Sequence, residues 1–385
     1  MHAAESFKPY QLLESQQMMF DILNEPEKFM QHFRRYANSL ISTTTFGCRV
    51  PTYEDPYFKE LFDIFGRFVL IAQTGTAGLL DYMPALRALP SWILPSKRRA
   101  KAHHQQEKAL YSIGLLAEQK ELGFDDDFAS YITGTLLEAG SDTTANTLLG
   151  FVCAMLVFPE VQHRARAEVD RVVGLHRMPL PDDEPKMQYI RGCVKESVRW
   201  MPTTILGAIP HAVIKDDYYM GFRIPAGAGV LNNVYAIHND PSRYPHPERF
   251  DPDRFKDDQQ SFFDAAMNPD VSKRDHFAFG AGRRICPGIH IAEKSLFLTI
   301  ARLLWAFEFR RPVDSNGSEI VPDPTQVTQG FVCAPLPFRA IISPRDPARA
   351  EIIRKEWRDA KDKNLVVSMQ WKKFPINSVE AVSNQ

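Results

Sequence analysis

Cys286 lies in a glycine- and arginine-rich segment, from Phe279 to Gly288, that directly precedes an apolar stretch. A cysteine at the N-terminus of a helix lies near the positive end of the helix dipole, which favours its thiolate form. Glycines let the backbone pass close to a large planar ligand, and Arg284 can pair with an acidic group of that ligand. An isolated cysteine in an apolar region is more often a small core residue, but these neighbours favour a ligand role for Cys286.

The other cysteines do not form a recognisable site. Their number is odd, none belongs to a CxxC pair, and this sparse set argues against a disulfide framework and against structural zinc. The five are Cys48, Cys153, Cys193, Cys286 and Cys333. The balance of 46 basic and 47 acidic residues gives no field that would attract nucleic acid.

Glu196 and Arg199 are three residues apart on a predicted helix, so they share a face and can pair. An exposed pair of this kind would stabilise the fold little, but the apolar neighbours Val194 and Trp200 favour a buried pair. A third group, Ala139-Gly140-Ser141-Asp142-Thr143-Thr144, places a glycine inside a long predicted helix, which costs about 1 kcal/mol. That glycine is explained equally well by a close helix crossing.

Helical periodicity dominates the elements that must position these groups, so the fold class is mainly α with a minor β region. Acidic residues at 125–127 cap the long helix, which spans roughly 45 Å and ends at Pro159. Helices are predicted at about 25–40, 97–120, 126–158, 184–200 and 289–307. A small antiparallel sheet is predicted at 212–234, an irregular meander at 239–270 and a polar C-terminal tail at 346–385.

The cysteine segment resembles the haem-binding loop of the cytochrome P450 family. The family pattern F-x-x-G-x-R-x-C-x-G is matched at Phe279, Gly282, Arg284, Cys286 and Gly288. The resemblance implies that Cys286 ligates the iron of haem b, that Arg284 contacts a haem propionate and that Phe279 packs beside the sulfur. A thiolate ligand donates electron density to the iron.

The Glu196/Arg199 pair is similar to the family's E-x-x-R motif, which takes a second arginine from the meander. Arg249 and Arg254 both fit P-x-R-F, but the longer family pattern starts at Tyr244 and ends on Arg254. The resemblance therefore implies a structural triad of Glu196, Arg199 and Arg254, with Arg249 outside it.

The glycine-containing segment of the long helix resembles the family's A/G-G-x-D/E-T element, which forms a groove over the iron. By that resemblance Thr143 hydrogen-bonds dioxygen, Asp142 helps to supply protons, and Ala139 and Gly140 line the substrate pocket. Further pocket residues are expected after the Glu/Arg helix and in a turn near position 331, and His211 would be either a core histidine or a contact to a propionate. These further pocket residues are Thr204, Ile205 and Phe331.

The resemblance implies a single catalytic domain, 1–385, with the cytochrome P450 fold, N-terminally incomplete because the family's membrane anchor and early helices have no counterpart. One of those helices carries a W-x-x-x-R element that contacts the haem propionates. We expect no membrane span in this chain, because its longest charge-free stretch, 143–159, is shorter than the roughly 20 apolar residues that are needed. Full-length members reside at the cytosolic face of the endoplasmic reticulum membrane, and a chain without the anchor would be cytoplasmic and monomeric.

The activity implied is a haem-thiolate monooxygenase that inserts one oxygen atom from O2 into an apolar small molecule. Electrons would come from NADPH through NADPH-cytochrome P450 reductase. The sequence resembles filamentous-fungal members of the family, which implies a role in secondary metabolism. The reductase would dock near basic residues around the cysteine loop, although a solvated basic face explains these residues equally well. They are Lys273, Arg274, Arg283 and Lys294.

Two other functions compete with this one. A haem-thiolate isomerase or dehydratase needs no external electrons, but it would have no use for the pair Asp142 and Thr143. A truncated, non-catalytic remnant would bind haem weakly or not at all, which the missing N-terminal element favours. The substrate stays open among steroids, terpenoids, polyketides and alkaloids.

Overall fold

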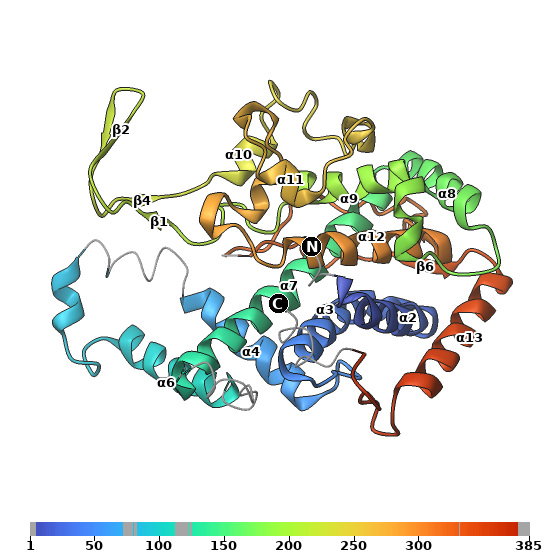
Figure 1. Ribbon diagram of the computed structural model, residues 1–385, viewed down its shortest axis with the longest axis horizontal. Coiled ribbons are helices and arrows are strands. Elements are labelled where there is room, and N and C mark those ends of the chain that lie inside the picture. Colours follow the sequence, from blue (N-terminus) through green and yellow to red (C-terminus); the bar gives the residue numbers. More distant parts are fainter. Residues whose placement is uncertain are drawn as a thin grey trace.

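The fold is mainly helical, with short strands confined to three places (Figure 1). The computed structural model describes residues 5–71, 80, 83–111, 123, 125–330 and 332–375. The α-helices are α2 Lys8–Asn24, α3 Phe29–Phe46, α4 Pro56–Ile71, α6 Pro95–Tyr111, α7 Asp126–Val157, α8 Pro159–Val173, α9 Gln188–Trp200, α10 Val234–His238, α11 Phe262–Ala266, α12 Ile289–Ala306 and α13 Pro347–Asn364. The 3-10 helices are η1 Pro26–Lys28, η2 Pro84–Ala88, η5 Pro181–Lys186, η6 Pro252–Phe255, η7 Val271–Lys273, η8 Phe277–Phe279 and η9 Gly282–Arg284.

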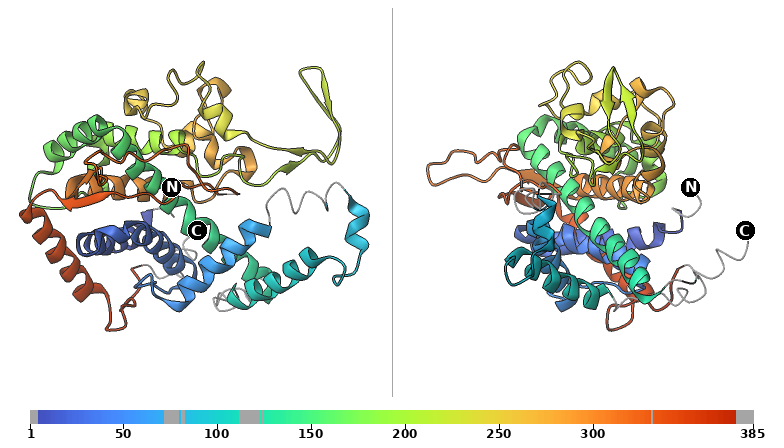
Figure 2. Two further views of the ribbon diagram at one scale, coloured as in Figure 1. Left: turned by 180° about the vertical axis from the view of Figure 1, so that it is seen from behind. Right: turned by 90° about the vertical axis from the view of Figure 1, so that its left-hand side faces the viewer.

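The described strands form three separate antiparallel pairs. These are β1 His211–Ala212 with β4 Gly229–Val230, β2 Asp217–Tyr219 with β3 Phe222–Ile224, and β5 Phe307–Arg310 with β6 Ile341–Pro344. The sheet predicted at 212–234 therefore consists of two short ladders. They lie on an arm that projects from the helical body in both Figure 1 and the rear view of Figure 2, and their side chains are mostly exposed.

Helix α7 organises the core. Asp125 caps its N-terminus by accepting a hydrogen bond from the backbone N–H of Phe128, and Pro159 begins α8 directly after it. In Figures 1 and 2, α7 runs obliquely from the group α2–α6 to the group α8–α12. Residues 145–156 of α7 are all buried, and so are residues 295–306 of α12, which packs against α7, α8 and α9. The predicted helix at 126–158 is confirmed.

Two segments differ from expectation. The chain before residue 25 forms α2, which was not predicted, because its polar residues are buried in interactions that periodicity does not reveal. Glu14 lies between the guanidinium groups of Arg35 and Arg49, and all three side chains are almost fully buried. The polar tail also contains a helix, α13, which packs along α2. Part of the helix predicted at 97–120 lies outside the described residues.

Candidate haem-thiolate site

The cysteine loop runs from η8 through η9 to the N-terminus of α12. The backbone N–H of Cys286 donates to the carbonyl oxygen of Phe279 at 2.8 Å, which closes the loop. The backbone N–H of Gly288 donates to the Cys286 sulfur, although burial still raises the pKa of this thiol. The sulfur is thus half-buried at the start of a helix, where a positive metal centre would favour the thiolate.

The loop leaves open space at Gly282. Gly282 has φ +64°, a conformation that favours glycine, and a Cβ built on it would meet no atom within 4 Å. Arg284 is exposed and makes no ion pair with any other described residue. The described residues hold no cluster of three or more His, Cys, Asp or Glu side chains that could bind a metal ion. The sulfur of Cys286 suits a metal that takes one protein ligand and obtains its remaining ligands from a prosthetic group.

Aromatic packing fixes the loop from behind. The Phe279 ring lies 5.3 Å from the Phe262 ring of α11, and the buried His276 lies 4.2 Å from Phe262. Thr204 is half-buried, and its hydroxyl donates to the carbonyl oxygen of Ala278 at 2.8 Å, so the segment after α9 is attached to the cysteine loop.

Glu196, Arg199 and Arg254 lie together in the buried space between α9 and the meander. Arg199 donates to both carboxylate oxygens of Glu196, at 2.6 and 2.7 Å, and Arg254 Nε lies 3.3 Å from Glu196 Oε1. Arg199 also donates to the carbonyl oxygens of His238 and Arg249, at 2.9 and 3.1 Å. Burial raises the pKa of Glu196, and its hydrogen bonds and the charges of the two arginines partly offset that effect.

The side chain of Arg249, by contrast, is exposed, and its one ion pair with a described residue is with Glu160, at 4.0 Å. The sequence pattern thus selected the arginine that contacts Glu196. Trp200 adds a further tie, because its indole N–H donates to the carbonyl oxygen of Glu248 at 2.8 Å. One helix therefore holds the meander through several buried polar contacts.

Helix α3 packs closely against the glycine-containing segment of α7. A Cβ at Gly140 would lie 2.7 Å from Cγ1 of Ile41, so the glycine is required by a close helix crossing. Asn38 donates to the hydroxyl of Ser141 at 2.7 Å, one residue further along α7. The structure therefore shows the close helix crossing at Gly140 that the sequence left open as an alternative, and the pocket role of Gly140 stays a prediction.

Asp142 and Thr143 follow on the same helix. The Thr143 hydroxyl donates to the carbonyl oxygen of Ala139 at 2.7 Å, and the Ala139 side chain is exposed. Asp142 accepts a hydrogen bond from Asn146 at 3.2 Å and lies 3.7 Å from Arg34 Nε. Burial raises the pKa of Asp142, while Arg34 and Asn146 act in the opposite direction.

Sequence reasoning did not identify the α3 residues Arg34, Asn38 and Ile41. They lie at i, i+4 and i+7 on one face of an amphipathic helix, and this spacing was the available signal. Nothing local to that helix, however, indicates which other helix this face meets.

The remaining expected site residues are less well placed. His211 is exposed on β1, so the expectation of a core histidine is wrong. Ile205 is half-buried next to Thr204, while Phe331 lies outside the described residues. The turn that would carry Phe331 is linked to the segment after α9, since the N–H of Cys333 donates to the carbonyl oxygen of Thr203 at 2.7 Å.

Two of the four basic residues near the loop are engaged in ion pairs. Lys294 pairs with Glu5, and Lys273 lies 3.6 Å from Asp270. Arg274 donates to the carbonyl oxygen of Asn268 at 2.7 Å. Arg283 and Arg284 are exposed, and no other described residue forms an ion pair with either.

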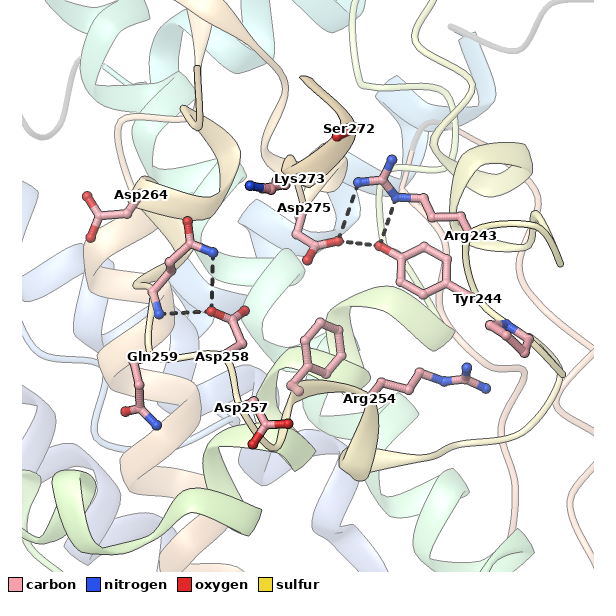
Figure 3. A pocket seen from close by; sticks show the side chains of 13 residues that line it. Arg243, Tyr244, Arg254, Asp257, Asp258, Gln259, Asp264, Ser272, Lys273 and Asp275 are labelled. Carbon is pink, nitrogen blue, oxygen red and sulfur yellow. Dashed lines mark hydrogen bonds and ion pairs between the residues drawn. The ribbon is translucent and has the colours of Figure 1, made fainter. Parts of the chain in front are cut away.

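A polar cavity of about 990 Å³ opens beside the segment that precedes the cysteine loop (Figure 3). Its walls carry acidic and basic side chains of the meander together, including Asp257, Asp264 and Lys273. Asp275 interacts there with Tyr244 and Arg243 (Figure 3). Such a lining does not suit an apolar substrate.

None of the described helices is by itself both long and apolar enough to cross a bilayer. Among the described residues, α7 and α8 taken together are long and apolar enough, but they meet at 108°.

Comparison with known proteins agrees with this arrangement. The family model for cytochrome P450 matches residues 14–341. The chain is 46% identical to cytochrome P450 monooxygenase virE of Hypocrea virens, over 97% of this chain and 71% of that protein. It is 44% identical to cytochrome P450 monooxygenase fogE of Aspergillus ruber, over 97% of this chain and 72% of that protein.

Two solved structures of a zebra fish cytochrome P450, one with abiraterone and one with progesterone, have the same fold. Their TM-scores are 0.66 and 0.68 at 22% and 24% identity, and each match covers 89% of this chain and 80% of the other. The sequence motif, the fold and the family match agree: the chain belongs to the cytochrome P450 family and is a cytochrome P450 monooxygenase.

Proposed function

We propose that this chain binds haem b through the thiolate of Cys286 and inserts one oxygen atom from O2 into an apolar small molecule. The observation that carries the proposal is the cysteine loop, in which the Cys286 sulfur receives the N–H of Gly288 while the space at Gly282 stays open. Haem ligated by a thiolate supplies the activation of dioxygen.

Three further residues would hold the haem. Arg284 offers an exposed, fixed positive charge for a propionate, and Phe279 packs behind the sulfur against α11. His211 would be a second propionate contact, which requires its exposed side chain to lie against the haem edge. Burial raises the pKa of the Cys286 thiol, and the hydrogen bond from the backbone N–H of Gly288 partly offsets this effect.

The residues of α7 would orient dioxygen and deliver protons. The Thr143 hydroxyl, now donating to the Ala139 carbonyl oxygen, can turn to a ligand in the groove, and Asp142 exchanges protons with solvent. Positioned proton delivery is typically worth 10²–10⁴-fold in rate. The exposed methyl of Ala139 and the half-buried Ile205 would form apolar walls for the substrate, with Phe331 opposite them.

We further propose that the electrons come from NADPH through NADPH-cytochrome P450 reductase. The exposed Arg283 offers positive charge beside the loop for an acidic partner. We place the enzyme in secondary metabolism, because the matched relatives are fungal monooxygenases.

The proposal is tested by reconstituting the chain with haem and recording the reduced, carbon monoxide-bound spectrum. Thiolate ligation gives a red-shifted Soret band, which should vanish in Cys286→Ser. The control is Cys153→Ser, which alters a cysteine buried in the second half of α7 and should keep the band. A wild-type spectrum without that band would refute haem-thiolate ligation, and NADPH consumption with added reductase then tests the electron source.

A further inference from the structure

Asp142 has an unusual set of partners for a carboxylate on a buried helix. Its Oδ2 accepts a hydrogen bond from Asn146, but its Oδ1 is buried and has no hydrogen-bond partner among the described residues. The neighbouring cation is Arg34, whose Nε lies 3.7 Å away, too far for a direct hydrogen bond but near enough for a strong charge interaction. The charge state of Asp142 therefore depends on Arg34 and on burial.

Arg34 connects this carboxylate to the protein surface. Its side chain is 44% exposed, against 14% for that of Asp142, and its guanidinium lies over the ring of Phe62 on α4, 5.7 Å from the ring centre. The helix that carries it cannot slide along α7, because Ile41 fills the space beside Gly140. The guanidinium is thus held at one edge of α7, between solvent and Asp142.

Another acidic side chain near Asp142 points elsewhere. Glu138 lies one turn earlier on α7 and interacts with Tyr111 of α6, and burial raises its pKa to about 7. It does not contribute to the charge balance at Asp142, which is set by Arg34 and Asn146.

We propose that Arg34 is a positioning residue for Asp142, which keeps the carboxylate ionised at the solvent-facing edge of α7 so that it can collect protons from water. In each cycle the carboxylate takes one proton from a water molecule at the Arg34 side and passes one to the Thr143 side, so the ionised form is restored. Arg34 keeps its own protons throughout. This inference rests on the proposed role of Asp142 in proton delivery.

The experiment replaces Arg34 by Gln in the haem-loaded enzyme and measures product and peroxide formed per NADPH consumed. The matched control is Arg164→Gln, because Arg164 also pairs with an aspartate, Asp253, and lies over an aromatic ring, Tyr189, but on α8. We expect Arg34→Gln to lower product per NADPH roughly two- to fivefold, the effect of losing a partly exposed ion pair, and the control to leave it unchanged.

A second measurement does not depend on turnover. Thermal midpoints of the wild type, Arg34→Gln, Asp142→Asn and the double variant form a cycle at several pH values. The two charges attract only while Asp142 is ionised, so the non-additive part should be present above the pKa of Asp142 and lost as the pH falls through it. We expect this part to be on the order of 1 °C.

The outcomes separate this inference from the proposed function. If Asp142→Asn leaves product per NADPH unchanged, proton delivery by Asp142 is wrong. If Asp142→Asn lowers it but Arg34→Gln behaves like Arg164→Gln, the role of Arg34 is refuted and that of Asp142 stands. Arg34→Lys keeps the charge, so it should recover at least half of the product per NADPH that Arg34→Gln loses. If it recovers none, the effect comes from packing on Phe62, and the inference is overturned.

Discussion

Ile41 of α3 fills the space that a side chain at position 140 of α7 would need, with its Cγ1 only 2.7 Å from the Cβ position of Gly140. The contact fixes the register of the two helices. As a result, the next residues of α7, Ser141 and Asp142, face Asn38 and Arg34. The segment proposed to orient dioxygen and deliver protons is therefore positioned by its contacts with α3.

Replacing Gly140 by Ala should destabilise the protein by about 1–3 kcal/mol, because the new methyl would overpack the crossing. Urea unfolding measures the change in the free energy of unfolding. Ile41→Ala removes the atoms that clash, so the double variant should lose less than the sum of the two single losses. Strict additivity would show that the two residues do not share this space.

Thr143→Ala should keep the haem but divert reducing equivalents to peroxide, because the variant lacks the hydroxyl that now donates to Ala139. Product formed per NADPH should fall roughly a hundredfold, at the lower end of the range for positioned proton delivery. Thr143→Ser retains the hydroxyl and is the control. Equal coupling in the alanine variant and the wild type would contradict the role of Thr143.

Removing the carboxylate of Glu196 should cost roughly 3–5 kcal/mol, because two arginine side chains would lose their buried counter-charge. The loss should appear as poor folding or haem release when unfolding and haem content are measured in Glu196→Ala. The control is Arg249→Ala, which removes an exposed side chain and should change stability by less than about 0.5 kcal/mol. A stable, haem-replete Glu196→Ala variant would argue against the triad.

Acid should weaken the fold through His238, a fully buried histidine whose pKa burial lowers to about 3. The unfolded chain takes up a proton near the ordinary histidine pKa of about 6.5, whereas the folded chain does not. The contribution of His238 to the free energy of unfolding is therefore fully present above about pH 6.5. Below that pH the free energy of unfolding falls by up to about 1.4 kcal/mol per pH unit.

The free energy of unfolding at pH 7 and pH 5 checks this prediction. Its difference should be smaller in His238→Asn than in the wild type. His163→Asn, which alters an exposed histidine on α8, is the control and should keep the wild-type difference. The same pH dependence in His238→Asn and the wild type would exclude His238 as the source.

Much of the site could be predicted because its determinants are local. The residues around Cys286 are contiguous, and their spacing survives in the sequence whatever the surroundings. The long helix was marked by its own cap at Asp125 and its own stop at Pro159. Arg254 was separated from Arg249 by a spacing rule that reflects the path of the meander towards Glu196.

Other features depended on contacts between distant segments. Glu14 is buried between Arg35 and Arg49, and this burial places a polar segment in the core as helix α2. Hydrophobic periodicity does not predict that helix. His211 looked equally suited to a core position or a ligand contact, and only the projecting arm shows it to be exposed.

The sequence alone therefore determined the proposed chemistry, because the cysteine loop and the glycine–acid–threonine segment are each formed by neighbouring residues. The tertiary structure decided what holds that chemistry in place. Gly140 proved to be a helix crossing, and Arg34 proved to face Asp142, because both depend on how α3 lies across α7. Such packing is set by the shape and charge of two distant surfaces together, which no single stretch of sequence contains.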